Sequence, residues 1–136
     1  RRKNMQNIRS KGTLTEQKIM RDLRRRKIYF AKNVAGLIGK PDILFRRKKI
    51  AVFIDSDFWH GHPKRNNKPK TNVEYWQKKI YKNRFRDKEV NRELKKKGFK
   101  VIRIWEFDIK KNYNKALNRI LRATNHVTKF DIQTNH

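Results

Sequence analysis

The segment from Pro41 to His60 reads PDILF-RRKK-IAVFID-SDFWH, and it decides the fold of this chain. Two short apolar runs flank a turn of four basic residues, which is the pattern of two strands joined by a tight connection. The proline disfavours a helix before the first run. An acid therefore opens one strand, and the second strand ends in a cluster of acids, aromatic rings and an imidazole.

The flanking segments extend these two strands into an α/β fold with a small mixed sheet flanked by helices. Thr13 to Glu16 fits a capping box, which begins a helix that ends near Arg26. Gly98 is placed to end a long helix at its C′ position. In chain order we predict a helix at 13–26, strands at 28–33, 42–46 and 49–55, a loop at 61–71, a helix at 73–97, a strand at 100–105 and a helix at 116–123.

Length and composition predict one domain, 1–136, with a basic arm at 1–12 and a polar tail at 125–136. The net charge of +27 favours nucleic acid as the partner, although a ribosomal-type binder has the same charge. The chain has no cysteine, which excludes disulfides and thiolate metal sites. No apolar stretch approaches the roughly 20 residues of a membrane span. We therefore expect an intracellular, cytoplasmic protein with no membrane partner.

Asp42 and Asp55 are the first candidates for a site. A lone aspartate after a proline is most often a turn or cap residue, so Asp42 alone does not indicate catalysis. If the two strands pair as neighbours, however, both carboxylates lie in the same region of the sheet and repel each other unless a cation lies between them. That cation is either a divalent metal ion or one of the many Lys and Arg side chains.

Phe58, Trp59 and His60 follow directly. Aromatic residues near a sheet usually belong to the core, but here the neighbours on both sides are polar. Exposed rings beside basic groups are suited to stacking on bases or to insertion between base steps. A histidine this close to a proposed phosphate site is a candidate general base.

The long helix places Asp87 on its apolar face, where a carboxylate needs a partner. That partner is either a basic side chain such as Arg84 or Arg86, in a structural ion pair, or a histidine that the carboxylate orients. Glu16 has two readings as well, because it is a capping residue and also lies on the inward face of the first helix. The apolar stripe of the long helix is Trp76, Ile80, Asn83, Asp87, Val90 and Leu94.

Together these residues resemble the very short patch repair (Vsr) DNA mismatch endonucleases, from about Lys3 to Ile109. Each motif alone is weak, but the combination is specific. The motifs are residues 2–8 (RKNMQNI), Thr15-Glu16, 39–42 (GKPD), 52–55 (VFID), 58–60 (FWH), 74–76 (EYW), Arg86-Asp87, and the strand from Gly98 to Glu106.

The resemblance implies a restriction-endonuclease-like fold and an enzyme that cuts one strand of double-stranded DNA at a T:G mismatch with Mg²⁺. It implies that Asp42 is the central metal ligand and that Ile54 contributes its backbone carbonyl. His60 would be the general base, with Asp87 orienting it and Glu16 supporting the site. The DNA-binding residues that it implies are the aromatic wedge Phe58, Trp59 and Trp76 and the arm residues Arg2, Lys3 and Met5.

Two departures from the family matter. The family commonly carries a structural zinc site built on Cys and His, and here Asp57 and Phe107 stand at two of those positions, so we predict no zinc. Asp55 stands where some members have His, and we count it as a further metal ligand. We expect activity to depend on Mg²⁺ or, in its place, Mn²⁺. We also expect a monomer that is associated with the nucleoid. The alternatives are a Vsr-like site-specific restriction or homing endonuclease and a non-catalytic basic DNA-binding module.

Overall fold

A four-stranded mixed sheet lies at the centre of the computed structural model, which describes residues 13–56 and 72–126. The strand order is β1-β2-β3-β4. β1 pairs antiparallel with β2, and β2 with β3, whereas β4 runs parallel to β3. The expected mixed sheet is therefore confirmed. The strands are β1 (Ala31–Lys32), β2 (Ile43–Phe45), β3 (Ile50–Asp55) and β4 (Lys100–Trp105).

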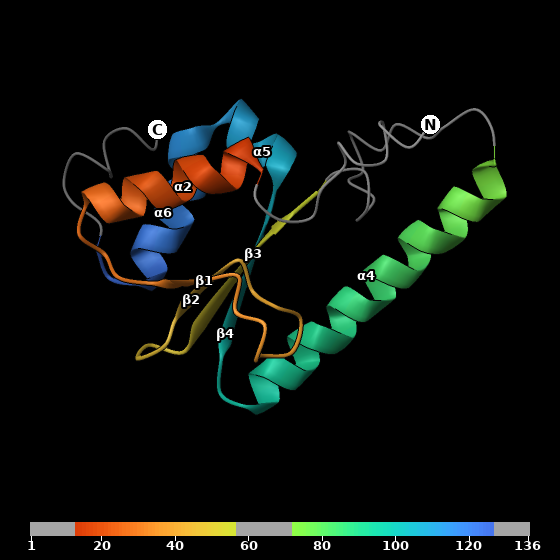
Figure 1. The fold of residues 1–136 in the computed structure, drawn as a ribbon, viewed down its shortest axis with the longest axis horizontal. Coiled ribbons are helices and arrows are strands. Elements are labelled where there is room, and N and C mark those ends of the chain that lie inside the picture. Colours follow the sequence, from red (N-terminus) through yellow and green to blue (C-terminus); the bar gives the residue numbers. More distant parts are fainter. Residues whose placement is uncertain (1–12, 57–71, 127–136) are drawn as a thin grey trace.

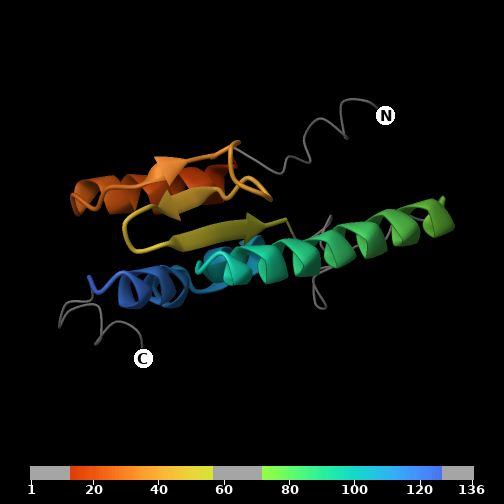
Figure 2. The same cartoon turned by 90° about the horizontal axis from the view of Figure 1, so that it is seen from below.

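Helices cover both faces of the sheet (Figures 1 and 2). Side chains alternate between the faces along each strand, so Ile43 and Val52 join one core cluster while Leu44 and Phe53 join the other. The first cluster packs under α2, α5 and α6, and the second packs under α4. The helices are α2 (Leu14–Arg25), α4 (Val73–Lys96), α5 (Glu106–Lys111) and α6 (Tyr113–Ala123).

The start of α2 has the predicted capping geometry. The Thr13 side chain accepts a hydrogen bond from the Glu16 amide at 3.3 Å, which satisfies one of the unpaired amides of the first turn. The inward stripe of this helix is Ile19, Met20 and Leu23, as expected, and all three are buried.

The C-terminal half of α4 packs on the sheet, and Ile80 in its N-terminal half is also buried. The predicted stripe is confirmed, because Val90 and Leu94 are buried in the cluster between α4 and the sheet. The N-terminal half extends beyond the sheet (Figure 1), and Tyr75 and Tyr81 there are 58% and 71% exposed. The helix ends where expected, with Gly98 following at φ +89°. One half of α4 thus anchors the helix, while the other half presents aromatic rings to solvent.

Three elements differ from the prediction. β1 is shorter than 28–33, because the Ile28 amide caps the end of α2 by donating to the Leu23 carbonyl at 2.9 Å. α6 begins at Tyr113, because the Asn112 side chain caps it by accepting from the Lys115 amide. The short helix α5 was not predicted at all. None of the described helices combines the length and the apolarity that a membrane crossing requires.

Candidate active site

Asp42 lies at the end of the sheet where the central strand β2 begins and its neighbour β3 ends. Its side chain is 2% exposed. Its amide donates to the Val52 carbonyl at 3.0 Å, and its Oδ2 accepts from the Ile54 amide at 2.7 Å. A hydrogen bond from a buried amide favours the charged form of a carboxylate. The structure therefore brings Asp42 and Ile54, two of the predicted metal-binding residues, into direct contact.

Asp55 is the last residue of β3, at the same end of the sheet, and it is 7% exposed. A cation does lie beside it, and that cation is an arginine from the neighbouring strand. The Arg103 guanidinium donates from Nη1 to Asp55 Oδ1 at 2.9 Å. The sequence left open whether a divalent metal ion or a basic side chain accompanies this carboxylate. The structure places a basic side chain, Arg103, beside Asp55.

Asp87 lies on the inward face of α4, as the spacing predicts, and reaches the same arginine. Its Oδ1 is 3.5 Å from Arg103 Nη1. The candidate partner Arg86 instead donates to Asn83 at 3.1 Å along the helix. His60, the other expected partner of Asp87, lies outside the described residues.

Glu16 is 1% exposed and lies at the start of α2, on the opposite face of the sheet from α4. Its neighbour Thr15 donates to Glu106 at 3.2 Å. Glu106 directly follows Trp105, the register partner of Asp55. The beginning of α2 is therefore placed at the same end of the sheet as Asp42 and Asp55.

Trp76 is half-buried near the start of α4, where its ring contacts Tyr75 edge to face at 5.1 Å. The remaining predicted residues lie outside the described part of the chain. They are Arg2, Lys3, Met5, Asp57, Phe58, Trp59 and His60.

Sequence reasoning missed Arg103, whose guanidinium contacts the carboxylates of both Asp55 and Asp87. A signal was present, because an arginine between Ile102 and Ile104 shares the face of β4 that packs toward α4. Its partner acids could be named only once the register of β3 and β4 was known.

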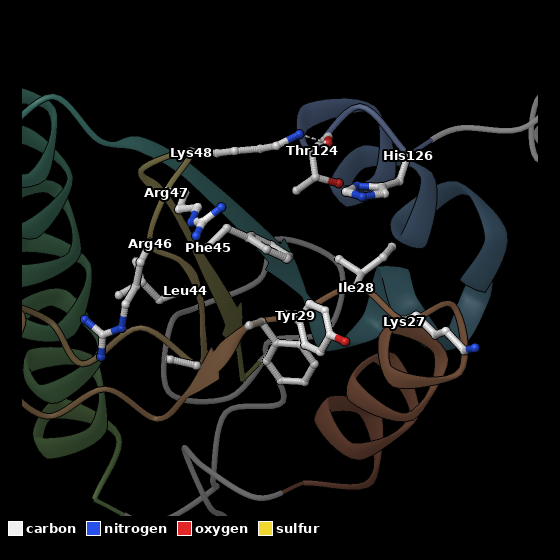
Figure 3. A pocket seen from close by; sticks show the side chains of 12 residues that line it. Lys27, Ile28, Tyr29, Leu44, Phe45, Arg46, Arg47, Lys48, Thr124 and His126 are labelled. Atoms are coloured by element: carbon white, nitrogen blue, oxygen red, sulfur yellow. Dashed lines mark hydrogen bonds between the residues drawn. The ribbon is translucent and has the colours of Figure 1, made fainter.

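A cavity of about 660 Å³ lies at the other end of the sheet, beside the turn between β2 and β3 (Figure 3). Apolar side chains form its floor, and basic residues stand at its rim, where Lys48 donates to the Thr124 carbonyl. Its lining includes Lys27, Ile28, Tyr29, Phe45, Arg47 and His126, and none of the predicted site residues. The candidate site, at the opposite end of the sheet, does not share this cavity.

The carboxylates of Asp42 and Asp55 lie together at one end of the sheet in a strongly basic protein. Such an arrangement is suited to cutting a phosphodiester, because the carboxylates can hold a metal ion and the basic surface attracts the phosphates. Residues 1–66 match the family model of the DNA mismatch endonuclease Vsr. The type II nicking enzyme V.NmeDIP of Neisseria meningitidis serogroup C is 38% identical over 90% of this chain and 84% of its own length. The chain belongs to the Vsr family.

Two further relatives support the assignment. The type II nicking enzyme V.NmeAIP of Neisseria meningitidis serogroup A is 40% identical over 87% of this chain and 86% of its own length. The DNA mismatch endonuclease Vsr of Escherichia coli K12 is 33% identical over 78% of this chain and 69% of its own length. The protein is therefore a Vsr-like DNA endonuclease, and its α/β core is restriction-endonuclease-like, as the resemblance implied.

Proposed function

We propose that this Vsr-family endonuclease nicks one strand of double-stranded DNA at a T:G mismatch and uses Mg²⁺ to do so. The observation that carries the proposal is the buried Asp42 carboxylate, held by the Ile54 amide at the end of the sheet. An aspartate is rarely this buried unless it is paired or coordinates a metal ion.

The residues at this end of the sheet fit a hard divalent cation. Mg²⁺ is usually held by one or two carboxylates together with waters and substrate phosphate oxygens. Asp42 would supply a carboxylate and Ile54 a backbone carbonyl, and the two residues are in contact. These two ligands fit that pattern. Bound there, the ion would neutralise the charge that develops on the scissile phosphate.

The chain's own residues supply the remaining functions. His60 takes a proton from the attacking water, and Asp87 holds the imidazole in the orientation that this requires. Glu16 supports this end of the sheet from the opposite layer. Arg2, Lys3 and Met5 contact the DNA from the arm, and the rings of Phe58, Trp59 and Trp76 enter the duplex beside the mismatch. A single chain suffices for these contacts, so we propose a monomer. We also propose that it contains no zinc, because the chain has no cysteine.

A second function is a Vsr-like site-specific endonuclease; five relatives are called type II nicking enzymes, a name that fits the cutting of one strand under either function. In the second case the enzyme recognises a fixed sequence, and the mismatch is not required. The chemistry at Asp42 is the same for both functions.

The test uses a T:G-mismatched duplex and its matched counterpart, each labelled on both strands and incubated with protein and Mg²⁺. We expect one strand to be cut, at the mismatch only, on a denaturing gel. Equal cutting of the matched duplex favours the fixed-sequence enzyme.

Asp42→Asn should abolish cutting and leave DNA binding intact, and His60→Ala should slow cutting by about 10²–10⁴-fold. Asp108→Asn, in which an exposed acid is neutralised, is the matched control. Full activity of folded Asp42→Asn would contradict the proposal.

A further inference from the structure

Arg103 is held by contacts from two elements at the candidate site. Its Nη1 donates to Asp55 at 2.9 Å, and its Nε donates to Asn91 of α4 at 2.7 Å. The guanidinium carbon lies 4.1 Å from the centre of the Phe53 ring, and Nη1 is 3.5 Å from Asp87. Contacts to β3 and α4 on different sides fix the position of this cation.

Burial makes the arrangement consequential. The side chains of Arg103, Asp55 and Asp87 are 18%, 9% and 21% exposed, so water screens their charges poorly. Two carboxylates that face one site repel each other unless a cation lies between them. Both contact the same nitrogen of Arg103. An arginine keeps its charge at every pH at which a protein is folded.

We propose that Arg103 is a positioning residue whose guanidinium takes the place that a divalent cation would otherwise occupy between Asp55 and Asp87. The proposal deepens the function proposed above and rests on it. Asp55 is then bound by Arg103 and is not a ligand of the catalytic metal, which is held by Asp42 and the Ile54 carbonyl. The charge between Asp55 and Asp87 stays in place at any Mg²⁺ concentration, and α4 stays tied to the end of β3.

Arg103→Met tests this directly, because methionine retains much of the side-chain length and removes the charge. The substitution removes the guanidinium charge that contacts both carboxylates, and carboxylate oxygens are ligands that suit Mn²⁺. We expect Arg103→Met to bind one more Mn²⁺ per chain than the wild-type protein in a titration followed by electron paramagnetic resonance, without DNA.

Four variants locate any added ion. Asp55→Asn alone should bind as many Mn²⁺ ions as the wild-type protein, whereas Arg103→Met combined with Asp55→Asn should lose the extra ion. Arg103→Lys should keep the wild-type number, because it restores a cation. Arg92→Met is the matched control, because it removes an exposed arginine that pairs with Glu89 within α4. It should leave the number of bound Mn²⁺ ions unchanged.

The inference is overturned if folded Arg103→Met binds no additional Mn²⁺ or if Asp55→Asn loses an ion that the wild-type protein binds. If Arg103→Met fails to fold, the Asp55→Asn result decides between the two assignments of Asp55. A wild-type protein that binds no Mn²⁺ argues against the metal site at Asp42. The extra ion in Arg103→Met remains a separate readout in that case.

Discussion

Gly39 brings the turn before Asp42 against the inner side of α4. Its φ is +84°, and a Cβ atom there would lie 2.5 Å from Val90 Cγ1 and 3.3 Å from Phe53 Cε1. Both neighbours belong to the cluster under α4. The absence of a side chain at this position thus allows the segment before Asp42 and the helix α4 to approach each other.

Gly39→Ala should therefore destabilise the protein by about 1–3 kcal/mol, because an added methyl overpacks this contact and the backbone conformation disfavours a side chain. Urea denaturation measures the change. Gly36→Ala is the matched control, since no atom lies within 4 Å of the added Cβ. That change should stay within about 0.5 kcal/mol. Equal effects of the two substitutions would contradict the packing argument.

Individual residues show how far the sequence could predict the site. The inward position of Asp87 follows from helical spacing, and the place of Asp42 follows from the proline before it. The partner of Asp87 could not be predicted, because Arg103 meets it only through the parallel pairing of β3 and β4. Long-range register of this kind is not encoded in any single segment.

At the scale of elements, α2 and α6 are joined by a partly buried polar contact. The Tyr113 hydroxyl donates to Asp22 at 2.7 Å. Burial raises the pKa of Asp22, but the hydrogen bonds from Tyr113 and Arg25 and the charges of Arg25 and Arg26 outweigh it, so the pKa lies below the ordinary 3.8. Burial, followed by the bond to Asp22, raises the pKa of Tyr113 above the ordinary 10.0.

Tyr113→Phe should cost about 1.5–3 kcal/mol at pH 7, the usual worth of a hydrogen bond to a charged group. Because the pKa of Asp22 is lowered by folding, its contribution is present above pH 3.8 and is lost as the pH falls through the folded value. Thermal unfolding at pH 7 and pH 3 should show the difference from the wild-type protein shrinking in acid. Tyr29→Phe is the control, since Tyr29 is 90% exposed, and it should have no effect at either pH.

The exposed half of α4 carries the next prediction. Trp76→Ala should reduce the preference for a mismatched duplex more than it reduces DNA affinity, because a mismatched step is easier to unstack. Nicking rates and binding constants on matched and mismatched duplexes measure the two effects. Tyr81→Ala is the control, since it removes an exposed ring about 140° around the helix axis. Unchanged discrimination by folded Trp76→Ala would contradict a wedge role.

The elements also show where periodicity stops being informative. β4 and α4 match their predicted ranges to within a residue, because each carries a long and regular pattern. α5 was missed, since its six residues follow β4 without a glycine or proline and are too short to show a helical period. The start of α6 depends on the Asn112 cap, which a search for apolar residues passes over.

The whole molecule carries a net charge of +27, which sets how it should respond to salt. Each phosphate that it neutralises releases counterions and contributes about −0.9 to the slope of log K against log salt. With about six to ten such contacts, affinity should fall by about 10³–10⁵-fold between 50 and 200 mM salt. Fluorescence anisotropy with the Asp42→Asn variant measures this without cleavage. The ratio of affinities for mismatched and matched duplexes should stay constant, and a salt-independent affinity would contradict the electrostatic account.

The C-terminal half of α4 packs on the sheet far from the ring of Trp76. Trp76 lies 18 residues from Leu94, a distance of about 27 Å along the axis. A tilt of about 5° at the packed end therefore moves the ring by about 2 Å. Small changes in the fit of Val90 against the sheet are amplified at the far tip, where the helix is proposed to meet DNA. If Trp76 has the proposed wedge role, we expect substitutions in the hydrophobic core under α4 to alter discrimination between duplexes from a distance.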